Sequence, residues 1–107
     1  MSITSSGRSI NLSAERTGIF PYPGQNGYIL SEGERSDLVS ILQLMINALN
    51  LNYDLPHVVQ SGEYDALTIK AVKLFQKMNL LEETGNVNGE TWDRLAEEYN
   101  ITVNDNQ

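Results

Sequence analysis

Large apolar side chains recur at three- and four-residue steps in three segments of the chain, and each segment predicts an amphipathic α-helix. The first runs from Ser36 to about Leu51, with Ser36 well suited to cap its N-terminus. We expect it to end near Asn50 and Asn52, which tolerate a left-handed backbone, because Pro56 prevents continuation. Its stripe is wide enough for a helix buried on much of its circumference. The stripe consists of Leu38, Val39, Ile41, Leu42, Met45, Ile46 and Leu49.

The second predicted helix runs from about Ala66 to Met78, and the third from about Gly89 to Asn100. The apolar row of the second consists of Leu67, Ala71, Leu74 and Met78, widened by Val72 and Phe75. That of the third consists of Trp92, Leu95, Ala96 and Tyr99. Three such helices with short connections predict an all-α fold, a compact three-helix bundle with at most a couple of short strands.

The remaining segments flank this bundle. Residues 1–18 are polar and predict a flexible arm or linker, and residues 102–107 predict a frayed tail or short extended piece. Between these, residues 19–101 form the predicted domain, of which 19–35 are an extended strap rich in Pro, Gly and aromatic residues. The large side chains of the strap either cover the core or form an exposed aromatic platform. We favour a core-covering strap, because a small domain gains from extra apolar cover. These side chains are Phe20, Tyr22, Tyr28 and Ile29.

A short phrase occurs twice, as SGEYDALT at 61–68 and as TGNVNGET at 84–91, each time before an apolar run. Its Asp or Asn can cap a helix, and its Thr can return a hydrogen bond to that cap. Its Tyr or Val can pack onto the first helical turn, against Ile69 or Trp92, and its Gly supplies a turn. The phrase therefore predicts the start of a helix without any ligand. The shared positions are Gly62, Tyr64, Asp65 and Thr68, matched by Gly85, Val87, Asn88 and Thr91.

Charge and composition exclude several functions. Seven Lys and Arg face fourteen Asp and Glu, which gives a net charge of −7 and makes nucleic acid an unsuitable partner. No apolar run approaches the roughly 20 residues that cross a membrane, and no signal peptide is visible. The chain has no Cys, and His57 is its single histidine, so no catalytic triad or metal-ligand pair is expected. We expect no enzyme activity, no cofactor and no metal.

The chain from about Leu30 to Leu95 resembles the bacterial peptidoglycan-binding domain, a three-helix module attached to many cell-wall hydrolases. The resemblance rests on Leu-Ser-Glu-Gly at 30–33, Val-Ser-Ile-Leu-Gln at 39–43, the Gly-Glu-Tyr-Asp to Phe-Gln stretch at 62–76, and Gly-Asn-Val-Asn to Leu at 85–95. Phe-Pro-Tyr-Pro-Gly at 20–24 resembles the strap that often precedes this module. Ser61 and Thr84 stand where the family has aspartates, and Asp65 and Asn88 stand where it has second glycines.

The resemblance implies a non-catalytic module that anchors an associated protein, such as a hydrolase or phage structural protein, to peptidoglycan. It also implies a cell-wall or extracellular location, and we expect a monomer. The alternative is an assembly module of a phage tail, spore or hydrolase that keeps the bundle without binding glycan.

A ligand of sugars and peptide stems calls for aromatic, amide and carboxylate groups on a shallow groove. For Tyr64, Asp65 and Gln76 we favour structural roles, as staple, cap and buried amide. The Tyr64 hydroxyl has no evident partner, however, so Tyr64 is the first ligand contact to consider within the repeated phrase. The candidate ligand-binding residues are Tyr53, Gln60, Tyr64, Asp65, Gln76 and Asn79.

Overall fold

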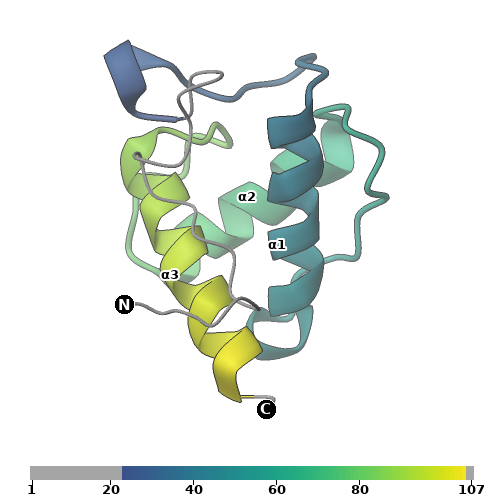
Figure 1. Cartoon of the computed structure of the whole chain (residues 1–107), viewed down its shortest axis with the longest axis vertical. Coiled ribbons are helices and arrows are strands. Elements are labelled where there is room, and N and C mark those ends of the chain that lie inside the picture. The colour runs from purple at the N-terminus through teal and green to yellow at the C-terminus, as the bar shows by residue number, and fades with distance from the viewer. Residues whose placement is uncertain (1–22, 106–107) are drawn as a thin grey trace.

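A computed structural model describes residues 23–105 and shows an all-α bundle, which confirms the predicted fold class. Helix α1 spans Asp37–Tyr53, α2 spans Ala66–Met78 and α3 spans Gly89–Asp105, and a short 3₁₀ turn, η2, occupies Gln25–Gly27. Helices α1 and α3 lie beside each other, and α2 crosses behind them (Figure 1). The predicted arm, together with Phe20 and Tyr22 of the strap, lies outside the described residues.

The helix ends differ from the prediction in two places. Ser36 caps α1 as expected, its Oγ accepting a hydrogen bond from the Val39 N–H at 3.4 Å. The left-handed residue that ends α1 is Asp54, with φ of 52°, rather than either asparagine; Asn50 stays helical and donates to the Leu55 carbonyl. Helix α3 continues to Asp105, so residues 101–105 extend the helix beyond the predicted end at Asn100.

The core lies between the three helices. From α1 come Leu38, Val39, Leu42, Met45, Ile46 and Leu49, and from α3 come Trp92, Leu95 and Tyr99. The predicted apolar row of α2 is partly wrong, because Leu67 and Met78 at its ends are 41% and 52% exposed. The inner face of α2 instead carries two polar residues, Thr68 and Gln76, which accompany Ala71, Val72 and Phe75. The side chains of these two polar residues can be buried because each forms hydrogen bonds within the protein, as described below.

The strap ties both repeated phrases to the start of α1. Leu30 and Val87 exchange two backbone hydrogen bonds, of 3.0 and 2.9 Å, as an antiparallel bridge. Four residues after Leu30 in the strap, the Glu34 carbonyl accepts a hydrogen bond from the Tyr64 N–H at 2.9 Å. Tyr28 packs against the core and its hydroxyl donates to the Glu34 carboxylate, whereas Ile29 is 47% exposed. Within the described residues, the strap therefore covers the core through Tyr28 and Leu30.

The strap also contacts the start of α3 at one point of close backbone approach. A Cβ placed on Gly24, whose φ is +94°, would lie only 2.7 Å from the Gly89 Cα. Only glycine at both positions allows this contact, because an added Cβ on either side would meet backbone. The first turn of α3 therefore packs against the strap on one side and against the core on the other.

Candidate functional site

The first repeated phrase is held by a buried glutamine of α1. Gln43, with no exposed surface, accepts a hydrogen bond from the Gly62 N–H at 2.9 Å through its Oε1. Its Nε2 donates to the Glu63 carbonyl at 2.9 Å and to the Thr68 hydroxyl at 3.1 Å. One amide side chain thus satisfies both a donor and an acceptor of the loop and joins the loop to α2.

A second glutamine holds the second phrase in the same way. Gln76 of α2 accepts from the Gly85 N–H at 3.0 Å and donates to the Asn86 carbonyl at 2.9 Å. Its Nε2 also lies 3.2 Å from the hydroxyls of Thr84 and Thr91. The favoured structural role of Gln76, a buried amide bonded to backbone, agrees with these contacts, and the side chain is only 1% exposed.

Tyr64 connects the two loops. The sequence alone indicates no hydrogen-bond partner for its hydroxyl. In the structure the hydroxyl donates to the Gly85 carbonyl at 2.6 Å. The ring is 1% exposed, and this burial raises the pKa of the phenol above its usual range. The size of the side chain, which exceeds what a helix staple needs, is therefore explained by its reach to the second loop. In this conformation no atom of the Tyr64 ring is available to a ligand.

Asp65 acts as the predicted cap of α2. Its Oδ1 accepts from the Thr68 N–H at 3.0 Å and from the Thr68 hydroxyl at 2.7 Å. These bonds lower the pKa of the Asp65 carboxyl. The Thr68 hydroxyl therefore returns a hydrogen bond to the cap as predicted, and the bond is made to the Asp65 side chain. Asn88 caps α3 alike, accepting from the Thr91 N–H at 2.9 Å.

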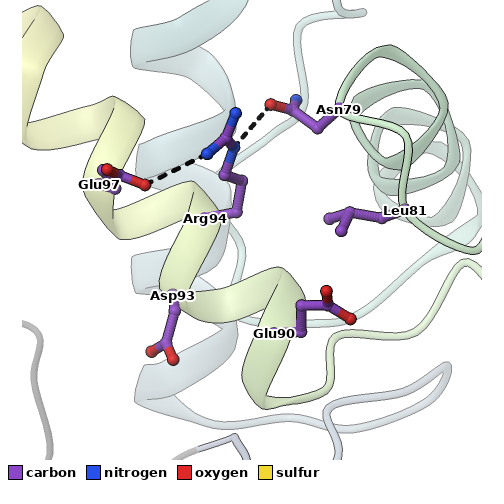
Figure 2. Close-up of a pocket in the computed structure, with 6 residues that line it drawn as sticks. All are labelled: Asn79, Leu81, Glu90, Asp93, Arg94 and Glu97. Carbon is purple, nitrogen blue, oxygen red and sulfur yellow. Dashed lines mark hydrogen bonds and ion pairs between the residues drawn. The ribbon is translucent and has the colours of Figure 1, made fainter.

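A groove lies between the end of α2 and the outer face of α3, and its lining includes Glu90 of the second repeated phrase. Its volume is about 360 Å³. Four of its side chains project from successive turns of α3, while the other two follow the last turn of α2 (Figure 2). The lining is charged on the α3 side and contains one leucine on the α2 side. The lining residues are Asn79, Leu81, Glu90, Asp93, Arg94 and Glu97.

Arg94 lies at the centre of this groove (Figure 2). Its Nε donates to the Asn79 Oδ1 at 2.9 Å, and its Nη1 lies 3.4 Å from the Glu97 carboxylate. Asn79 is fixed in turn, because its Nδ2 donates to the Phe75 carbonyl at 3.0 Å. Nη2 of Arg94 has no hydrogen bond or ion pair to any described residue, so it can donate to a ligand. Among the described residues that line the groove are thus one cation, one amide and three carboxylates, of which the Asp93 carboxylate points away from Arg94 and Asn79 (Figure 2).

Tyr53, the last residue of α1, adjoins the same region. Its hydroxyl donates to the Glu98 carboxylate at 2.8 Å. Its ring packs edge to face against the ring of Phe75, with 5.2 Å between the ring centroids. Burial and the Glu98 hydrogen bond raise the pKa of Tyr53, while a hydrogen bond with Asn79 and the charge of Arg94 oppose that rise. The structure therefore brings together two of the six candidates, Tyr53 and Asn79.

The other four candidates lie elsewhere. Gln60 is exposed in the loop that joins α1 to α2. Much of that loop runs on the opposite side of α1 from α3 (Figure 1). Asp65 follows at the end of that loop, and Tyr64 and Gln76 are buried. The sequence reasoning missed the acidic side chains and Arg94 of α3. A signal was available, because Glu90, Asp93, Arg94 and Glu97 follow the spacing of one polar helix face.

Residues 23–105 show neither a metal-binding cluster nor a membrane-spanning helix. In that range no cluster of three or more His, Cys, Asp or Glu side chains is arranged to hold a metal ion. Likewise, none of the helices described here is both long and apolar enough to span a membrane.

Comparison with known families gives one match. Residues 35–95 match the model of the family described as "Putative peptidoglycan binding domain". No match was found among curated proteins or among solved structures. The matched range covers more than half of the chain and includes α1, α2, both repeated phrases and most of the groove. The chain belongs to the peptidoglycan-binding domain family.

Proposed function

We propose that this chain is a non-catalytic module that binds peptidoglycan and thereby holds an associated protein at the bacterial cell wall. The observation that carries the proposal is the family match at residues 35–95. That family is a binding domain rather than a catalytic one, and peptidoglycan is the partner that it supports. The companion would be a cell-wall hydrolase or a phage structural protein, and the module would act as a monomer.

We assign ligand binding to the groove between α2 and α3. Arg94 can donate charge-assisted hydrogen bonds to a carboxylate through Nη2, while the carboxylate of Glu90 can accept from an ammonium group. Peptide stems of peptidoglycan carry both kinds of group, whereas its sugars are mostly uncharged. A charged groove with no aromatic side chain among its described lining residues therefore suits the stem better than the glycan strand.

The earlier candidate residues divide accordingly. Asn79 and Tyr53 remain in the proposed site, because they contact or adjoin Arg94. Gln60 and Asp65 are accessible but lie outside the groove, so we give them no part in it. Tyr64 and Gln76 support the site indirectly, since they fix the loop that leads into α3.

The proposal is tested by sedimenting the purified chain with peptidoglycan sacculi. Sacculi should first be stripped of teichoic acids, because the net charge of −7 would otherwise repel the chain from anionic polymers at low salt. We expect the chain to pellet in proportion to the amount of sacculi and to be released by solubilised peptidoglycan fragments. A chain that stays in the supernatant at every sacculus concentration would contradict the proposal.

A further inference from the structure

The end of α2 adopts a left-handed turn at a leucine. The Leu81 N–H donates to the Gln76 carbonyl at 2.8 Å, and the Leu80 N–H donates to the Lys77 carbonyl at 3.2 Å. This pair of bonds is the Schellman pattern that closes many helices, and its left-handed position is usually occupied by Gly or Asn. Here that position is Leu80, with φ of 59°.

Folding alone gives no reason for a leucine at this position. A leucine with positive φ is strained, because its Cβ lies too close to the following carbonyl oxygen. The side chain of Leu80 is also 94% exposed, so burial does not offset that strain. The chain uses a residue better suited to this backbone at the end of α1, where Asp54 has φ of 52°. Strained residues that persist without a structural gain tend to mark functional sites.

The position of Leu80 points to the groove. Its neighbours on either side, Asn79 and Leu81, both line the groove, so Leu80 belongs to the segment that forms the α2 side of the groove, although its own side chain is not part of the lining. The groove itself is largely polar, and Leu81 is the one apolar residue among the described residues that line it. A stem peptide presents methyl groups of alanine between its charged groups, and such a ligand needs apolar contacts as well as ionic ones.

We propose that Leu80 is a ligand-contacting residue, whose exposed side chain packs against an alanyl methyl group of a peptide stem bound in the groove. This inference rests on the proposed function and deepens it, because it adds an apolar contact that selects the stem peptide. The left-handed backbone serves to project the side chain outward from this segment, where a residue continuing the helix would not lie. On ligand binding, the side chain of Leu80 loses its exposure.

The test compares two leucines that are almost equally exposed. Leu80→Ala keeps a residue with a Cβ at the left-handed position but removes most of the apolar side chain. Leu51→Ala removes the same atoms from a helical leucine of α1 that is 93% exposed and does not line the groove. We expect Leu80→Ala to weaken the binding of stripped sacculi by about tenfold, in line with the loss of a buried leucine side chain. Leu51→Ala should bind like the wild type.

A third variant, Leu80→Gly, separates binding from folding. Glycine relieves the backbone strain, so Leu80→Gly should raise the Tm or leave it unchanged while weakening sacculus binding as much as Leu80→Ala does. If both Leu80 variants bind like the wild type while Arg94→Ala does not, the role of Leu80 is refuted and the proposed function stands. If the wild type itself does not bind, both are refuted.

Discussion

Gln76→Met should destabilise the domain by about 3 kcal/mol, since each buried polar group left without a partner costs about 1–3 kcal/mol. Methionine has a similar length and fills the space of the glutamine but offers no comparable hydrogen bond. The buried Gly85 N–H would lose its acceptor, and the buried hydroxyl of Thr91 would lose its donor. The Asn86 carbonyl would lose less, because the Thr84 hydroxyl also donates to it, at 3.2 Å.

The equivalent change in the first loop should cost less. In Gln43→Met the Gly62 N–H is again left without an acceptor, but the Thr68 hydroxyl keeps its 2.7 Å bond to Asp65. We therefore expect a loss of about 2 kcal/mol. Gln60→Met is the matched control, because Gln60 is exposed and its replacement should change stability by less than about 0.5 kcal/mol. Urea unfolding, followed by circular dichroism, measures all three. Equal stabilities for Gln60→Met and Gln76→Met would refute the role of the buried amide.

Arg94→Ala should abolish most of the binding to peptidoglycan while leaving the fold intact. Arg94 is the only cation among residues 23–105 that line the groove. A hydrogen bond to a charged group contributes about 1.5–3 kcal/mol, so we expect binding at least about tenfold weaker. The side chain is 45% exposed and its ion pair with Glu97 is solvent-accessible. Loss of that pair should therefore cost no more than about 1 kcal/mol of stability.

Arg35→Ala provides a closely matched control for this prediction. Arg35 also forms one exposed ion pair, at 3.5 Å to Glu63, and its removal changes the net charge by the same amount. It lies outside the groove, so we expect sacculus binding close to that of the wild type. Equal weakening by the two substitutions would show that binding depends on overall charge, and the assignment of the groove would then be wrong.

The repeated phrase shows how much of the fold the sequence could predict. Caps, turns and apolar periods act over a few residues, so the helix starts at Asp65 and Asn88 could be predicted from local spacing. The partner of the Tyr64 hydroxyl could not, because it is a carbonyl 21 residues away in the second loop. The length of α3 was underestimated for a related reason: residues 101–105 lack a strong apolar period, yet Val103 packs against the core.

The candidate site was harder to predict because a groove is formed by elements that are distant in sequence. Asn79 was identified as an amide near the end of a helix, but its contact with Arg94 depends on how α2 crosses α3. Gln76 carries the same chemical group and lies on the inner face, where it binds backbone instead. Side-chain type alone cannot separate two such residues, since their exposure is set by packing.

The most direct test of the account is a titration of the ¹⁵N-labelled chain with soluble peptidoglycan stem peptides, followed by amide chemical shifts. We expect the largest shifts at residues 79–81 and along the outer face of α3 from Glu90 to Glu97, with Arg94 among them. Amides of the loop at 57–65, including Gln60 and Tyr64, should hardly move. Shifts concentrated in that loop, or no shifts at saturating peptide, would contradict the assignment of peptidoglycan binding to this groove.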